Sequence, residues 1–475
     1  MSRGEQLLKG TLIYAAGSFS ARFLSVLMIP VLTRLLAPAE YGYYDLVLTA
    51  ASVIIPFACL LVYDAEYRLL MDVRDERQKN QVFTNTLWVA CSGLVVFSLL
   101  FWIYTWFRPM QYSTWIYVYI LTSALNYVWL QAARGLGNPG TFAASGILTT
   151  LVVMISGFVL IYYFELKADA LLIAAVVASL SSLVFLEAKL HLSRRLDFGL
   201  LSMLRVREIL VYSVPLLPNA LSWWLMAGAS RYIINLNGGV YYNGIYAVTL
   251  KFPAVLSIVA SVFQIAWQDS AIAEYRSADR NAYYSKVFRI YMTVILSVVL
   301  LAIPVTATSF RYLLGSQYAE SYAYIPLLFL SSAFSIFALF YGTGYVSSRR
   351  TIGAFTTTLV AGCLNVSLGY ALFSHVQLYG IVISSLISSL FLWLLRAVTM
   401  KSYFQIRVDW GLLVILLTLI GSFTGCYHFA SRAVNLFLVP VGLGIGWYLN
   451  KDTTRHVFEL SRKFLKLILR PEGAM

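Results

Sequence analysis

Charged residues are scarce in this sequence, at 12% of 475 positions, while hydrophobic residues make up 60%. A soluble chain could not bury so much apolar surface. The hydrophilic stretches are too short for a soluble catalytic or nucleotide-binding domain, and no GxxxxGK[ST] loop is present. Cysteine is also rare, and its four occurrences have no metal-ligand spacing. These absences argue against a soluble enzyme, an ATP-driven pump and a disulfide-rich scaffold.

Long apolar runs, separated by short polar breaks, fill the rest of the chain. They are long enough to cross hydrocarbon as helices, about 20 residues each, and lack the period-two alternation of a membrane barrel. The fold class is therefore all-α, a polytopic integral membrane protein with about 14 transmembrane helices. The expected spans are 12–32, 44–62, 83–106, 114–133, 142–164, 168–186, 209–236, 240–266, 291–310, 325–346, 352–373, 379–395, 412–430 and 434–449.

Lysine and arginine alternate sharply between the two sides of this arrangement. With the N-terminus inside, 27 of the 35 basic residues fall in inner segments and five in outer loops. Cytoplasmic loops carry such an excess, so both termini are expected in the cytoplasm. The net charge of +14 then needs no nucleic acid as partner, and anionic membrane lipids are sufficient.

The spans divide into two halves. We expect an N-terminal lobe of six helices at 1–190, an amphipathic connector at 191–208, a C-terminal lobe of six helices at 209–400, two extra helices at 401–450 and an amphipathic tail at 451–475. The segment 187–208 mixes apolar and basic residues in the manner of an interfacial helix. Gly42 and Gly244 open the second and eighth spans in similar contexts, which indicates repeated halves or a hairpin repeated for packing.

Three basic residues lie inside expected spans: Arg22, Arg231 and Lys251. A charge at the centre of a bilayer costs about 2.5–3.5 kcal/mol, so each needs a partner or water. Ser18 shares a helix face with Arg22, and Asn235 follows Arg231 by one turn. A cationic cavity that binds an anionic phosphate or diphosphate group would satisfy them.

No carboxylate is expected at the same depth, because the nearest acidic residues fall at span ends. Two alternatives remain open: Arg22 pairs with Asp64 or another end carboxylate, or Arg231 reaches the outer headgroups. Lys251 is too deep for the second alternative. The acidic residues closest to spans are Asp45, Asp64, Glu66, Glu187 and Asp269.

Three segments resemble bacterial polysaccharide flippases of the O-antigen type, within the multidrug, oligosaccharidyl-lipid and polysaccharide exporter superfamily. They are IPVLTRLLAPAEYGYYDL (29–46), VYSVPLLPNALSWWLMAGASRYIINLNGG (211–239) and NGIYAVTLKFP (243–253). The resemblance implies two six-helix lobes, two further helices and translocation of an undecaprenyl-diphosphate-linked oligosaccharide. By position, Arg22, Arg231 and Lys251 match the cationic cavity of that family. No proton-coupling carboxylate matches residue by residue.

The resemblance implies a place in the bacterial inner membrane. Such a flippase requires no covalent chemistry, and we expect no cofactor and no metal. A polysaccharide polymerase and chain-length proteins are candidate partners. One rival is a drug exporter of the same superfamily, which would favour carboxylates in its cavity. A membrane-embedded polymerase or ligase is a second rival, although its catalytic groups normally need a long outer loop. A scaffold that transports nothing is the third.

Overall fold

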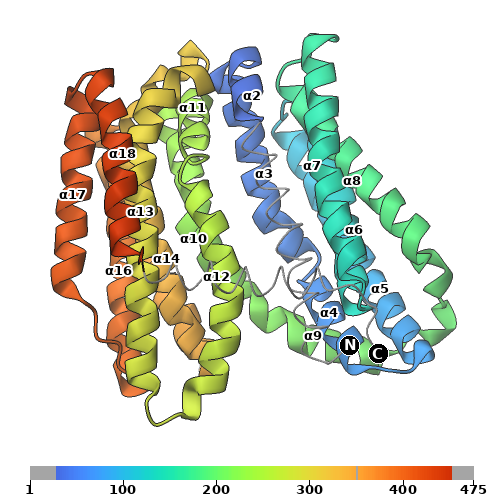
Figure 1. Cartoon of the computed structure of the whole chain (residues 1–475). Helices are drawn as coiled ribbons and strands as arrows, with labels where there is room; N and C mark the ends of the chain where they lie inside the picture. Colours follow the sequence, from blue (N-terminus) through green and yellow to red (C-terminus); the bar gives the residue numbers. More distant parts are fainter. Residues whose placement is uncertain (1–27, 349–350, 452–475) are drawn as a thin grey trace, which may run out of the picture. The chain divides into compact units, whose positions relative to one another are not determined.

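The chain is represented by a computed structural model that describes residues 28–348 and 351–451 (Figure 1). Throughout these residues the secondary structure is α-helix with short 3₁₀ turns, and they contain no strand. The all-α prediction is therefore confirmed. Ser18, Arg22 and almost all of the amphipathic tail lie outside the described residues.

The described helices include 11 that are long and apolar enough to cross a membrane, or up to 12 if the interrupted pair Ala229–Thr249 and Ala254–Ser261 is one span. The chain is thus a multi-pass membrane protein. Two expected spans are not among these helices. The span 12–32 lies mostly outside the described residues, and 114–133 corresponds to α6 (Ser113–Gly135), which has no continuous stretch apolar enough to be included. The count of 14 stays a prediction.

Contacts between residues group the chain into two compact units. The first unit holds residues 1–251, 313–321 and 355–388, and the second holds 252–312, 322–354 and 389–475. The predicted lobe boundaries remain a prediction. The first unit contains α2 (Ile29–Leu35), α3 (Pro38–Ala58), α4 (Val62–Asp72), α5 (Glu76–Phe107), α6, α7 (Pro139–Tyr162), α8 (Ala168–Leu190), α9 (Met203–Ser213), α10 (Leu217–Ala227), α11 (Ala229–Thr249) and most of α15 (Thr351–Val376).

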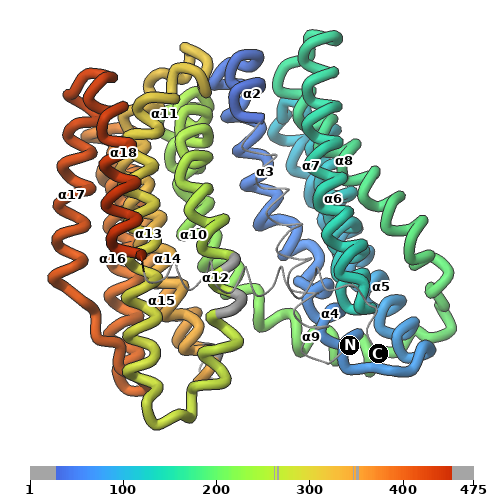
Figure 2. Tube along the Cα trace, viewed as in Figure 1, coloured from blue at the N-terminus to red at the C-terminus, as the bar shows by residue number. Residues whose placement is uncertain are grey.

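Within the first unit, α8 packs against α7 and α6, while α3 packs against α11 and α4 against α6. Figure 2 shows α4 and α9 at the end of this unit where α5 begins, and α4 contacts both helices. A cluster of buried apolar side chains, including Val62, Leu70, Val82 and Phe83, fills this end. The cluster is apolar because each of these amphipathic helices turns its apolar face toward the others where their ends meet.

The second unit is built around aromatic rings. It contains α12 (Ala254–Ala273), α13 (Arg280–Leu313), α14 (Ile325–Ser347), the second half of α16 (Leu378–Thr399), α17 (Trp410–Phe429) and α18 (Arg432–Leu449). The Trp267 and Phe340 rings stack with centroids 4.1 Å apart, as do those of Phe263 and Tyr291. The Trp267, Phe340 and Tyr291 rings are buried, so they serve packing rather than contact with a sugar.

Arg396 of α16 is buried in the second unit, with 2% of its surface exposed. Its Nη1 donates to the Ala338 carbonyl at 2.7 Å, and its guanidinium carbon lies 6.0 Å from the centroid of the Tyr345 ring. The sequence predicts Arg396 in an inner loop beyond the span 379–395. That placement is wrong because α16 continues to Thr399.

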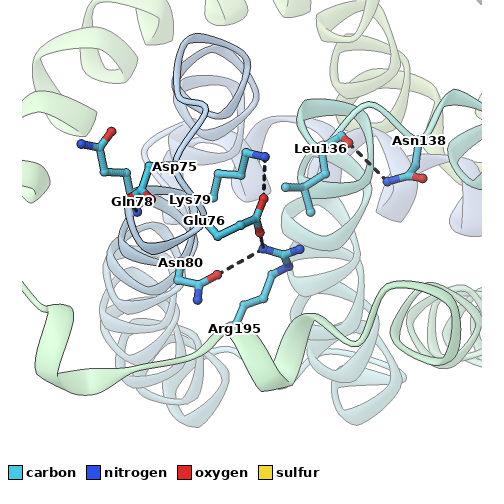
Figure 3. A network of polar contacts seen from close by, with 8 residues as sticks. All are labelled: Asp75, Glu76, Gln78, Lys79, Asn80, Leu136, Asn138 and Arg195. Carbon is cyan, nitrogen blue, oxygen red and sulfur yellow. Dashed lines mark hydrogen bonds and ion pairs between the residues drawn. The ribbon is translucent and has the colours of Figure 1, made fainter.

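The connector between the predicted lobes is not one amphipathic helix. After α8 ends at Leu190 the chain makes two 3₁₀ turns, Leu192–Arg195 and Phe198–Leu200, before α9 begins at Met203. Arg195 Nη1 donates to Glu76 Oε2 at 2.7 Å and to Asn80 Oδ1 at 3.2 Å, and Lys79 shares the same carboxylate (Figure 3). Other side chains of α5 bond the backbone of the connector: Thr84 Oγ1 accepts from the Asp197 N–H at 3.2 Å, and Asn85 Oδ1 accepts from the Ser202 N–H at 2.9 Å.

Candidate functional site

An ion pair links α3 and α11 inside their spans. Arg231 Nε donates to Asp45 Oδ2 at 2.5 Å, and the two side chains are only 16% and 13% exposed. The alternative that Arg231 reaches outer headgroups is therefore wrong. The expectation that no carboxylate lies at the same depth also fails for Arg231.

Asp45 lies deeper than expected because α3 begins earlier than its apolar run. Pro38 occupies the first turn, and Glu40 accepts a hydrogen bond from the Ala37 backbone N–H at 2.9 Å. Proline at the helix start and a carboxylate two residues later are sequence features of an N-terminus. They would have placed Asp45 two turns inside the helix.

A fold-back of α11 brings Tyr246 to Arg231. Gly239 has φ 79° and ψ 179°, a conformation that only glycine adopts readily. The Arg231 guanidinium carbon lies 5.9 Å from the Tyr246 ring centroid. In a straight helix these residues would be about 22 Å apart along the axis. The predicted boundary between the seventh and eighth spans, at 236–240, thus coincides with this turn.

Lys251 lies in the interruption between α11 and α12. Its ammonium group interacts favourably with the Tyr41 hydroxyl and with Asp45, and it is repelled by the positive charge of Arg231. Asp45 is therefore the shared carboxylate of two cations. Together Arg231, Lys251 and Asp45 carry one net positive charge, and we refer to these three residues with Tyr41 and Tyr246 as the charged cluster.

The junction between α10 and α11 fixes the position of Arg231. The helix is interrupted at Gly228, which leaves backbone carbonyls without intrahelical donors. Arg231 Nη1 donates to the Ala227 carbonyl at 2.7 Å. Asn365 Nδ2 of α15 donates to the Met226 carbonyl at 3.2 Å and to Ser230 Oγ at 3.3 Å. In lipid such groups must be satisfied inside the protein, and the bond to the Ala227 carbonyl also positions the Arg231 guanidinium at this junction.

The cluster brings together two of the five residues expected at the site, Arg231 and Lys251. Asn235 lies on the same half of α11, but within the described residues no hydrogen bond joins it to the cluster. Sequence reasoning missed Asp45, Tyr41 and Tyr246 as cluster members. No group of three histidine, cysteine or acidic residues that could hold a metal occurs in the part of the chain that the structure describes.

The family model of polysaccharide biosynthesis proteins matches residues 7–268, which include the whole cluster. The chain belongs to this polysaccharide biosynthesis protein family. No curated protein sequence matches the chain.

Solved structures with the same fold are transporters of the MATE type. An inward-facing multidrug resistance MATE family transporter of the MOP superfamily aligns with TM-score 0.64 and 14% identity, over 83% of this chain and 95% of that one. A MOP superfamily transporter from Pyrococcus furiosus, described as having a binding pocket of reverse polarity, aligns with TM-score 0.55 and 14% identity, over 85% of this chain and 99% of that one. A mutant of the Vibrio cholerae MATE transporter VcmN aligns with TM-score 0.55 and 13% identity, over 84% of this chain and 97% of that one. This member of the polysaccharide biosynthesis protein family thus has a MATE-like fold.

Proposed function

We propose that the protein is a flippase that moves a polyprenyl-diphosphate-linked oligosaccharide across the inner membrane by alternating access, for surface polysaccharide biosynthesis. The excess positive charge of the cluster is the observation that carries the proposal. Two cations share one carboxylate within the spans, so the site favours an additional anion. Membership of the polysaccharide biosynthesis family supports a sugar-bearing lipid as the cargo.

In this proposal Asp45 is an internal counter-ion that the diphosphate displaces. The Arg231 guanidinium offers a planar fork of donors to phosphate oxygens, and the Lys251 ammonium offers a compact charge. With Asp45 in place the cations are stable without cargo. Arrival of the headgroup brings a diphosphate, which carries more negative charge than one carboxylate, to both cations, and so it also compensates the positive charge that Asp45 alone leaves in excess. No covalent bond forms or breaks.

Alanine variants of the cations test this function. In a strain that lacks the gene, Arg22→Ala, Arg231→Ala and Lys251→Ala should each reduce surface polysaccharide while the protein stays in the membrane. Lys167→Ala is the matched control, because its side chain is 75% exposed and lies 3.8 Å from Glu40 outside the cluster. Normal export by all three cation variants would exclude an anionic cargo at this site.

A drug exporter is the second candidate, and Asp45 is the observation that favours it. A carboxylate inside a span can bind an organic cation, and the solved relatives named above include a multidrug transporter. The two functions predict opposite losses in a deletion strain. A drug exporter would leave surface polysaccharide intact and raise drug susceptibility, and Asp45→Asn would reproduce that susceptibility. A flippase would lose polysaccharide and keep its drug resistance.

A further inference from the structure

Glu66 is a fully buried carboxyl group that the charged cluster does not use. It lies on α4, its exposed fraction is 0%, and neither side-chain oxygen has a hydrogen-bond partner among the described residues. An ionised carboxylate in such a place would cost several kcal/mol. Glu66 is therefore protonated in this conformation.

The surroundings of Glu66 explain why it stays neutral. The helix α4 packs against α5, α6 and α9, and the neighbouring core consists of apolar side chains. Several titratable groups on these three helices have other partners, and Arg77 of α5 and Arg207 of α9 are exposed. On α6, Tyr127 stacks on Tyr63 and Arg134 lies over the Tyr67 ring. On α5, Glu76 pairs with Lys79 and Arg195. On α9, Arg205 pairs with Glu208.

Glu66 contrasts with the neighbouring carboxylate on the same helix. Asp64 Oδ1 accepts a hydrogen bond from Gln131 Nε2 at 3.0 Å, and Arg134 lies close enough to favour its charged form. Burial raises the pKa of both groups, but only Asp64 has groups that oppose the rise. The chain thus carries its own matched control for Glu66.

The joint that connects α4 to α3 is strained. Leu60 and Leu61 have φ of 52° and 53°, in the left-handed region that side chains with a Cβ avoid. Each such residue costs about 1–3 kcal/mol. Pro56 also lies inside the last turn of α3. The same helix α3 carries Asp45 in its first half, so a change of angle at this joint moves α4 relative to the helix of the charged cluster.

We propose that Glu66 is a proton-binding site, and that gain and loss of this proton drive α4 to close onto and open from α5, α6 and α9 about the Leu60–Leu61 joint. The role of this proton in coupling rests on the transport function proposed above. The protonated carboxyl is buried with α4 closed. When α4 opens, Glu66 meets water, releases its proton there and becomes a carboxylate, and it must bind a proton again before α4 can close.

The direction of the pH effect follows from linkage. Burial raises the pKa of Glu66 well above its ordinary value, so the closed state binds more protons than the open state. The stability of the closed state is therefore greatest in acid and falls as the pH rises above the ordinary value of a glutamate. Buried carboxyls in other proteins titrate as high as about pH 8–9.

Hydrogen–deuterium exchange of the full-length protein in nanodiscs, followed in peptides that cover 62–72, tests this proposal. After correction for the intrinsic pH dependence of exchange, opening of α4 in the wild type should increase about tenfold per pH unit while Glu66 titrates. Glu66→Gln, neutral and of equal size, should abolish this dependence, and Asp64→Asn should retain it. Equal pH dependence in wild type and Glu66→Gln would overturn the proposal.

Infrared spectroscopy supplies a measurement that does not depend on any cargo. The wild type should show at neutral pH a protonated carboxyl band that Glu66→Gln and Glu66→Met lack and Asp64→Asn keeps. Absence of that band from the wild type would mean that Glu66 is ionised, which also overturns the proposal. Because both measurements use protein without cargo, they can succeed even if the protein proves not to be a flippase.

The transport arm uses cells rather than purified protein. Glu66→Gln should lose polysaccharide export although it is folded and α4 is closed, and Asp64→Asn should export. Normal export by Glu66→Gln would remove Glu66 from the coupling step. If variants of the charged cluster lose export but keep the pH-dependent opening of α4 in the exchange experiment, the cargo site and the proton site at Glu66 are separate functions.

Discussion

Gly42 of α3 and Gly244 of α11 lie in direct backbone contact. A Cβ atom on Gly42 would stand 2.5 Å from the Gly244 nitrogen, and one on Gly244 would stand 1.8 Å from the Pro38 carbonyl oxygen. Asn243 Nδ2 reinforces the contact by donating to the Gly42 carbonyl at 2.7 Å. The two glycines whose contexts resemble each other in the sequence are thus the place where these helices meet, next to the charged cluster.

Substitution of Gly244 by alanine should separate the two helices. The added methyl group meets backbone atoms that cannot rotate away, so we expect a loss of about 3 kcal/mol or more. Thermal stability of the detergent-solubilised protein, followed by size-exclusion chromatography, measures it. Gly146→Ala on α7 is the control, because nothing lies within 4 Å of its Cβ position and alanine favours helix there. Equal melting of both variants would contradict a close contact.

The Asp45–Arg231 pair should show strong coupling in a double-mutant cycle. Asp45→Asn alone leaves Arg231 and Lys251 without their shared carboxylate, and the expected loss is about 3 kcal/mol. Asp45→Asn combined with Arg231→Gln should recover part of that loss, because the remaining groups are neutral amides and one cation. Unfolding by sodium dodecyl sulfate in mixed micelles gives the free energies. Additive effects of the single changes would show that the pair is not energetically coupled.

Span positions could be predicted from the sequence because apolar length alone determines them. The expected spans 168–186 and 412–430 correspond to α8 (Ala168–Leu190) and α17 (Trp410–Phe429). The positions of charged groups near span ends could not be predicted as well. The apolar runs place Asp45 and Arg396 at the ends of spans, although the helices extend past these runs and bury both residues. A hydropathy window averages over such residues, while their burial depends on the helices beside them.

Contacts between distant segments could not be predicted from the sequence, for a different reason. The fold-back at Gly239 places Tyr246 against Arg231, and no local pattern encodes that pairing. The sequence places Glu66 near the end of a span, yet in the structure it is fully buried on a helix that packs into a cluster of apolar side chains.

The predicted repeat gains support from two serine pairs. Ser123 and Ser179 join α6 to α8 with hydroxyls 3.2 Å apart, while Ser331 and Ser389 join α14 to α16 at 3.3 Å. The second pair follows the first by 208 and 210 positions, close to the spacing of Gly42 and Gly244. Matching pairs on matching helices favour repeated halves over a single repeated hairpin.

The helix α6 should cross the membrane although it has no continuous stretch as apolar as those of the 11 candidate spans. Its 23 residues reach about 35 Å, which exceeds the hydrocarbon thickness of about 30 Å. In a variant without native cysteines, Arg108→Cys and Asn138→Cys flank this helix. A membrane-impermeant maleimide applied to intact cells should label the first position and reach the second only after the membrane is opened. Labelling of both positions in intact cells would mean that α6 does not span, and the count of 14 would fall.

Arg195 should matter more for the ordered structure of the connector than for the unfolding free energy of the whole protein. Arg195→Ala removes the bonds to Glu76 and Asn80 (Figure 3), and Glu76 is 62% exposed, so the cost in unfolding free energy should stay below about 1 kcal/mol. The two 3₁₀ turns would then lose their attachment to α5. We expect faster cleavage within 191–202 by a protease at limiting concentration, with an unchanged melting temperature. Arg194→Ala is the control, because its exposed side chain makes no hydrogen bond or ion pair within the described residues. Equal cleavage of the two variants would show that the Arg195 network does not hold the connector in place.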